Sequence, residues 1–196
     1  TQGGNNNAWC QDNETSWYDW IRTDASNQMR SFVKRLIALR RAHPVFRRER
    51  FLEGAVDGEA LPDAWWFRPD GYKMTQKDWN AGETVLGLFL NGDTIPNLGP
   101  RGETVRDDSF LLLFNSSGDE REFVLPRKYM GPAWTLELST ADPDAGRAAG
   151  GDAGRDAGGD AGPDVGPDVG DAATRYEPHT PVSVAAHSML VLRRGE

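Results

Sequence analysis

The side chains best suited to chemistry lie in the first twenty residues, where amides and carboxylates are mixed with large aromatic rings. The polar groups include the triple asparagine at 5–7 and the pair Asp12–Asn13. The aromatic residues among them are Trp9, Trp17, Tyr18 and Trp20. Amides and carboxylates can hydrogen-bond hydroxyl groups in pairs, and an indole face stacks on the apolar face of a pyranose. The segment therefore suits a sugar-binding loop, but its residues taken alone favour the alternative, a polar surface loop held by its aromatic residues.

The carboxylates of this segment are Asp12, Glu14 and Asp19. Glycoside hydrolysis needs two carboxyl groups on either side of one bond, about 5–5.5 Å apart when configuration is retained. The sequence shows no apolar enclosure of the kind that raises the pKa of a proton-donating acid. We therefore predict no catalytic residue here, and we expect the three to accept hydrogen bonds within the loop or from sugar hydroxyls.

Metal and thiol chemistry have little support in the sequence. Cys10 is the single cysteine, so it has no partner for an internal disulfide or a cysteine-based zinc site. His43, His179 and His187 are scattered and fit no nucleophile or metal-ligand spacing. We predict no metal and no cofactor. His43 stands before Pro44, where we expect it to end a helix and face the carbonyl-rich terminus as a cation.

That helix is the first element predicted along the chain. Ser26 is a suitable N-cap, and Pro44 cannot continue a helix. The apolar residues between them recur at spacings of three and four: Met29, Phe32, Val33, Leu36 and Ile37. The sequence thus predicts an amphipathic helix of about four turns. Basic residues at 30–50 raise nucleic-acid binding as an alternative, but they fit the solvated face of this helix, so we expect no nucleic-acid partner.

From residue 51 onward the pattern changes to short apolar runs with a period of two, separated by turn residues. The predicted strands are Ala64–Arg68, Thr84–Leu90, Ser109–Asn115, Glu122–Leu125, Trp134–Ser139, Val182–Ala185 and Ser188–Arg193. Thr75 and Asp78 predict a capped helical turn. Several short strands with frequent turns favour an antiparallel β-sandwich, so the predicted fold class is mostly β.

Residues 141–173 interrupt this domain with a repeat of Gly, Asp, Ala and Pro about every four residues. The stretch holds eight aspartates against Arg147 and Arg155, so it carries most of the net charge of −8. Such a composition cannot bury enough apolar surface to offset its ordering entropy, which predicts a disordered insert. Regularly spaced Asp and Gly raise calcium binding as an alternative, but the repeat matches neither an EF-hand loop nor a calcium-binding nonapeptide.

Several separated motifs resemble one protein family, in the same order along the chain. They are the segment 4–20, Phe32–Phe46, Trp66–Gly71, Met74–Trp79, Leu90–Asp93, Asp107–Asn115 and Tyr176–Pro178. Together they resemble the region after the eighth barrel strand in bacterial glycogen debranching enzymes, the isoamylase-like branch of the α-amylase clan. The likeness covers most of residues 1–140 and resumes at Tyr176.

The resemblance implies that residues 1–50 are the last loop and helix of a (β/α)8 barrel, and that residues 51–196 are a C-terminal antiparallel β-sandwich. It also implies hydrolysis of α-1,6-glucosidic branch linkages in glycogen or limit dextrin. In that family the catalytic carboxylates precede the eighth strand, so we expect a C-terminal portion that is inactive alone. The matched loop borders the active-site cleft, which implies α-glucan contact at Asn6 and Asn7, with Asp12 and Asn13 as weaker candidates.

Two functional classes remain open from the sequence. One is a portion of a debranching hydrolase, and the other is a self-standing, non-catalytic β-sandwich that binds α-glucan or supports a partner. No apolar run approaches the roughly 20 residues that a membrane-spanning helix needs. The polar N-terminus does not resemble a secretory signal. We therefore expect no membrane partner and a cytoplasmic location.

Overall fold

The computed structural model describes residues 12–14, 17, 19–54, 61–142 and 174–195. The chain forms two compact units, Thr1–Leu39 and Arg40–Glu196. Asn6 and Asn7 lie outside the described residues, and so does the predicted insert from residue 143 onward. The boundary predicted at residue 50, between a barrel end and a β-domain, stays a prediction.

The helix α1 spans Asp24–Ala42, and none of its residues is buried. The predicted cap at Ser26 is wrong by three residues. Thr23 is the N-cap, because its carbonyl accepts the first helical hydrogen bond from the Asn27 N–H at 2.9 Å. The Thr23 N–H donates to the Ser26 hydroxyl at 2.9 Å, and the Ser26 N–H donates to the Thr23 hydroxyl at 3.2 Å. Ser26 thus occupies the third helical position of a reciprocal capping pair, where Glu or Gln is more usual.

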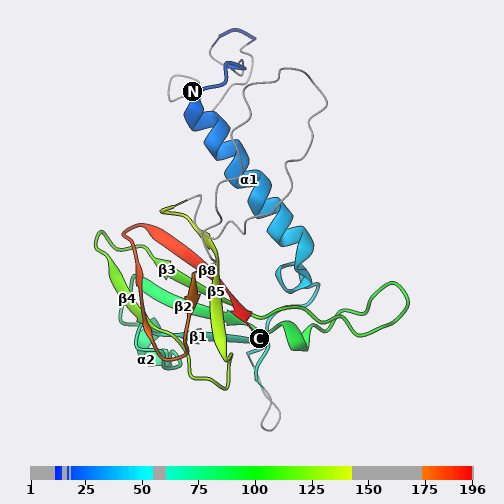
Figure 1. Ribbon diagram of the computed structural model, residues 1–196, viewed down its shortest axis with the longest axis vertical. Helices are drawn as coiled ribbons and strands as arrows, with labels where there is room; N and C mark the ends of the chain where they lie inside the picture. Colours follow the sequence, from blue (N-terminus) through cyan, green and yellow to red (C-terminus); the bar gives the residue numbers. More distant parts are fainter. Residues whose placement is uncertain (1–11, 15–16, 18, 55–60, 143–173, 196) are drawn as a thin grey trace. The chain divides into compact units, whose positions relative to one another are not determined.

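The rest of the described structure is mostly β (Figure 1). Its strands are β1 Ala64–Phe67, β2 Val85–Leu90, β3 Phe110–Asn115, β4 Arg121–Val124, β5 Ala133–Ser139, β6 Arg175–Tyr176, β7 Pro181–Val184 and β8 Ser188–Gly195. Short helical turns lie between them: η2 Pro44–Arg47, α2 Gln76–Trp79 and η3 Gly92–Thr94. All seven predicted strands form, with ends shifted by one or two residues. The two-residue β6 was not predicted, because it is too short to show an alternating pattern.

Two antiparallel sheets make up this unit. The larger has six strands in the order β1-β2-β3-β8-β5-β6, and the smaller pairs β4 with β7. The long central strands pair in full register, with Phe110 opposite Leu90 on one side and opposite Arg193 on the other. The mostly-β, antiparallel prediction is therefore confirmed. No helix in the described part of the chain is long and apolar enough to cross a membrane.

The two sheets share one hydrophobic core. The six-stranded sheet contributes Phe67, Phe89, Leu111 and Trp134, all of them 1% exposed or less. The two-stranded sheet contributes Phe123, Val182 and Val184. In β7 buried and exposed residues alternate, as expected for a strand with one face toward the core. The capped turn predicted at Thr75 is also confirmed, since Thr75 and Asp78 form a capping box at the start of α2.

Candidate functional site

The described part of the predicted sugar-binding loop lies in the N-terminal unit. Asp12 and Asn13 are both exposed. The Trp17 indole N–H donates to the Asp12 carboxylate at 2.7 Å, and the Trp17 backbone N–H donates to the Asn13 carbonyl at 3.0 Å. These bonds hold the Trp17 ring in place while 59% of that residue stays exposed. An indole fixed by its N–H and open on its face is suited to stacking on sugar, but contact of Asp12 and Asn13 with glucan stays a prediction.

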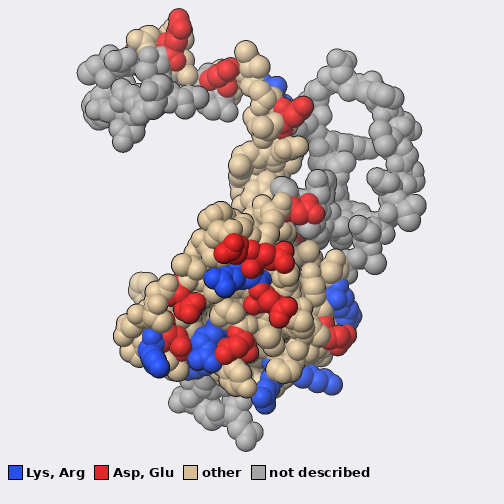
Figure 2. Space-filling view, turned by 90° about the vertical axis from the view of Figure 1, so that its left-hand side faces the viewer, with Lys and Arg blue, Asp and Glu red and all other residues tan. Residues whose placement is uncertain are grey.

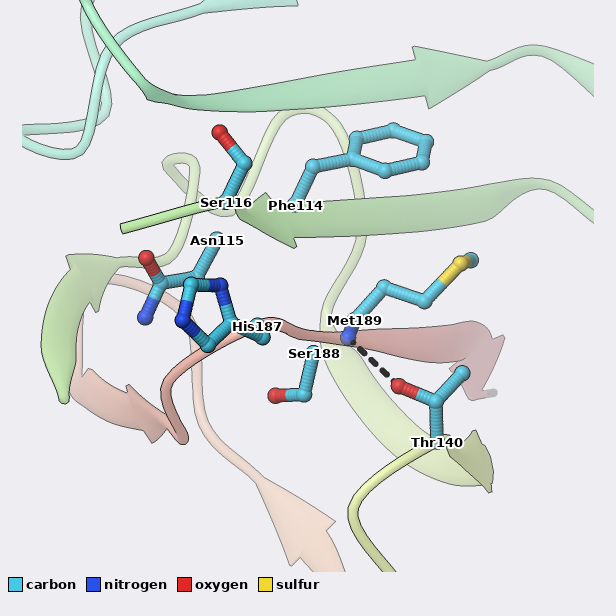
Figure 3. Close-up of a pocket in the computed structure, with 7 residues that line it drawn as sticks. All are labelled: Phe114, Asn115, Ser116, Thr140, His187, Ser188 and Met189. Atoms are coloured by element: carbon cyan, nitrogen blue, oxygen red, sulfur yellow. Dashed lines mark hydrogen bonds between the residues drawn. The ribbon is translucent and has the colours of Figure 1, made fainter. Parts of the chain in front are cut away.

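An open hollow lies at one end of the large sheet, with a volume of about 340 Å³ (Figure 3). Its lining residues are Phe114, Asn115, Ser116, Thr140, His187, Ser188 and Met189. Their polar atoms mostly bond to one another or to nearby backbone. The Met189 N–H donates to the Thr140 hydroxyl at 2.9 Å, and the Ser188 hydroxyl donates to the Ala185 carbonyl at 2.7 Å. The hollow therefore offers few free groups for orienting a ligand.

His43, Asp107 and Asp108 form a second cluster, with potential ligand atoms within 4.8 Å of one another. Asp107 Oδ1 lies 2.8 Å from His43 Nδ1 and accepts from the Asp108 N–H at 2.8 Å. Asp107 Oδ2 accepts from the Val45 N–H at 2.9 Å. Asp108 Oδ2 lies 3.3 Å from the Arg193 guanidinium. These oxygens already face N–H donors and an arginine, so the cluster is a structural clamp on residues 43–45 rather than a metal centre.

The role predicted for His43 needs correction. The helix does end beside it, at Ala42, but the imidazole bonds to Asp107 and not to the helix carbonyls. The cation at the helix end is Arg47, whose guanidinium donates to the Arg41 carbonyl at 3.0 Å. Sequence reasoning missed Asp107 because it lies 64 residues from His43 and leaves no local signal.

Arg48 and two aromatic rings complete the attachment of this segment to the large sheet. The Arg48 guanidinium donates to the carbonyls of Asn91 and Thr94. Partial burial lowers the pKa of Arg48 from its ordinary value, an effect that the charge of Asp63 opposes. Phe110 lies between His43 and Phe46, with ring centroids 4.7 Å from each. Residues 43–48 are thus tied to the β-rich unit by hydrogen bonds and by packing.

Replacing Asp107 by asparagine should lower the free energy of unfolding of the β-rich unit by about 2 kcal/mol. The amide keeps one acceptor oxygen and turns its NH2 group toward a backbone or imidazole N–H, which leaves a buried donor unpaired. Urea unfolding followed by tryptophan fluorescence measures the loss. Asp119→Asn is the matched control, because Asp119 is exposed on a turn. Equal unfolding midpoints for both variants would contradict the clamp.

Comparison with known proteins gives several relatives. The glycogen operon protein GlgX homolog of Mycobacterium tuberculosis is 44% identical over 146 residues, which cover 73% of this chain and 20% of that protein. A glycogen debranching enzyme of Pectobacterium carotovorum is 35% identical over 129 residues, covering 64% of the chain and 16% of that protein. The chain is homologous to a part of the glycogen debranching enzymes. An isoamylase of a Flavobacterium species is 27% identical over 143 residues, 72% of the chain and 17% of that protein.

The matches confirm the family resemblance found in the sequence motifs. The chain spans about a fifth of the length of the curated relatives it matches. No protein-family model matches it.

Proposed function

We propose that the chain is the C-terminal portion of a glycogen debranching enzyme that hydrolyses α-1,6 branch linkages in glycogen or limit dextrin. The observation that carries this proposal is the 44% identity over 73% of the chain to a glycogen operon protein. Matches to a debranching enzyme and an isoamylase support the same chemistry. In this proposal the catalytic carboxylates lie upstream, the chain is inactive alone, and the protein works in the cytoplasm.

The proposed architecture places the end of a (β/α)8 barrel at residues 1–50 and a C-terminal β-sandwich at 51–196. The two sheets with a common core support the second assignment. The exposed apolar residues of α1 support the first, because a helix on the outside of a barrel buries one apolar stripe against the strands. Met29 and Ile37 in this stripe are 62% and 46% exposed.

A partner other than α-glucan has weaker support. Figure 2 shows Lys and Arg interspersed with Asp and Glu on one face of the molecule, whereas nucleic-acid binding favours a surface of one positive sign. The net charge of −8 also disfavours binding to a polyanion such as nucleic acid. We therefore retain α-glucan as the proposed ligand of the parent enzyme.

The coding sequence upstream of residue 1 tests the proposal without any protein. An in-frame segment encoding a barrel with its catalytic carboxylates is expected. An unrelated upstream sequence would favour a self-standing, non-catalytic module instead.

In the complete protein, Asn6→Ala or Asn7→Ala should lower kcat/KM on branched limit dextrin by about threefold to tenfold. Each change removes an amide that can donate and accept at once, and one lost hydrogen bond costs about 0.5–1.5 kcal/mol. Steady-state kinetics measure the effect, and the division between kcat and KM shows whether the contact strengthens in the transition state. Asn80→Ala, at an exposed position in the β-rich unit, is the control. Unchanged kinetics in both loop variants would mean that neither Asn6 nor Asn7 contacts the substrate and that the loop has a structural role only.

A further inference from the structure

Two exposed tryptophans form a pair at the edge of the large sheet. Trp66 lies on the edge strand β1, between Trp65 and Phe67, whose side chains pack toward the core. Side chains alternate along a strand, so Trp66 points to the opposite face. Trp79 ends the short helix α2. The two ring centroids are 5.7 Å apart and the ring planes are inclined by 77°. Trp66 is 38% exposed and Trp79 is 47% exposed, so the pair presents a large aromatic surface.

Local hydrogen bonds fix the position of this exposed pair. The Met74 N–H donates to the Trp66 carbonyl at 2.9 Å, which folds the chain back alongside β1. The Thr75–Asp78 capping box then sets the turn that carries Trp79. Arg68, two residues after Trp66, lies 3.4 Å from Asp78 and joins the strand to the helix. The hydrogen bond from the Thr75 hydroxyl is the largest cause that lowers the pKa of Asp78, so this carboxylate is ionised at neutral pH. The indoles are therefore held in one arrangement before any ligand arrives.

The charges beside the pair are mixed in sign: Arg68, Lys73 and Lys77 stand among Asp70 and Asp78 in the stretch 66–79. Arg68 contacts both Asp70, at 2.5 Å, and Asp78. A cation paired with two carboxylates does not favour an anionic partner, and the carboxylates are already occupied by Arg68 and by N–H or O–H donors. The surface thus suits a neutral ligand that combines an apolar face with hydroxyl groups at its rim.

We propose that Trp66 and Trp79 form a binding site for an α-1,4-linked glucan chain, separate from the N-terminal loop. An indole face stacks on the apolar face of a glucose ring. An α-1,4-linked chain curves, so successive rings are inclined to one another, as are the two indole planes, which meet edge to face at 77°. The choice of glucan rests on the proposed function. The site would hold a branch or neighbouring chain of the polymer while hydrolysis takes place elsewhere.

Core packing does not explain this pair. Neither Trp66 nor Trp79 belongs to the shared core, although the two rings contact each other edge to face. Rigid, exposed aromatic residues are typical of binding surfaces, where they bury much area at a low cost in conformational entropy. A protein partner is the competing occupant, and the experiment below separates it from glucan.

The test is isothermal titration calorimetry of the full 196-residue chain with maltoheptaose. Trp79→Ala should raise the dissociation constant by about tenfold, the effect of losing one stacking contact. Trp66→Ala is the second variant, and thermal unfolding confirms that each variant is folded. Tyr129→Ala is the matched control: Tyr129 is 59% exposed and contacts Trp65, on the other face of the same strand. This control should bind as the wild-type chain does. Cellohexaose, a straighter β-1,4-linked chain, should bind at least tenfold more weakly.

Several results would overturn the proposal. One is the absence of maltoheptaose binding by the wild-type chain; another is equal binding of cellohexaose. Wild-type affinity in folded Trp66→Ala and Trp79→Ala variants would place glucan elsewhere, and loss of binding in Asn7→Ala alone would place it in the loop. Self-association of the chain that Trp79→Ala abolishes, without glucan binding, would make the surface a protein contact. If the complete protein hydrolyses limit dextrin while the chain shows any of these results, this inference fails and the proposed function stands.

Discussion

Gly92→Ala should lower the free energy of unfolding of the β-rich unit by about 3 kcal/mol or more, a large share of the total stability of a typical domain. A Cβ atom at Gly92 would lie 2.1 Å from the Asp107 carbonyl oxygen and 2.2 Å from that of Asp108. Both are backbone atoms, so no side chain can turn away to make room. Two hydrogen bonds also hold the Gly92 backbone close to these carbonyls. Its N–H donates to the Ser109 hydroxyl at 3.1 Å, and its carbonyl accepts from the Asp107 N–H at 3.0 Å.

Urea unfolding of Gly92→Ala is compared with that of Gly118→Ala. A Cβ atom at Gly118 would have no neighbour within 4 Å, and the backbone there is not left-handed, so its alanine variant should be close to neutral. The two variants add the same methyl group to different surroundings. Similar midpoints for both would show that the backbone at 107–108 can move away from Gly92 at little cost.

Asn115→Ala should cost about 3–4 kcal/mol of unfolding free energy. Asn115 is 2% exposed and lies at the end of β3. Its amide NH2 donates to the carbonyls of Asp119, Val184 and Ala185, at 2.8, 3.0 and 2.9 Å. Its side-chain oxygen accepts from the N–H and the hydroxyl of Ser117. Alanine would leave several of these buried groups unpaired, and it would release the turn after β3 from the end of β7.

Thermal unfolding by calorimetry measures this loss, with Asn80→Ala as the control. Asn80 is exposed and contributes its backbone to the end of α2, so its side chain can be removed at little cost. A small shift for Asn115→Ala, comparable to that of Asn80→Ala, would mean that water replaces the lost partners easily.

The regular elements could be predicted because their signals are local. Short continuous apolar runs mark β2, β3 and β8, and alternating apolar residues mark β5. Turn residues such as Gly71, before β2, and Gly118, after β3, bound these strands. The Thr75–Asp78 capping box is also a local pattern, which spans four residues. The start of α1 was misplaced because Thr23 and Ser26 are both good cap residues, and the hydrogen bonds decide between them.

The long-range contacts could not be predicted, although their residues stand inside the motifs that resemble the family. Asp107, Gly92 and Asn115 each have, besides any local contacts, partners that are 15 to 70 residues away in the sequence. Their pairing depends on the strand order of the large sheet, which no local pattern gives. The Trp66–Trp79 pair is similar: each residue was visible, but the edge position of β1 and the returning turn bring them together. Of the four predicted sugar contacts, the structure describes Asp12 and Asn13 only, and it adds the Asp12–Trp17 bond.

Hydrolysis of branched limit dextrin by the complete protein tests the central claim most directly. The complete protein should release reducing ends from limit dextrin and none from linear amylose, because α-1,6 branch linkages are its proposed substrate. The 196-residue chain alone should release none from either, since the acid and the nucleophile that glycoside hydrolysis requires are proposed to lie upstream. Release by the chain alone would mean that Asp12, Glu14 or Asp19 has a catalytic role. No release from limit dextrin by the folded complete protein would contradict the assignment as a debranching enzyme.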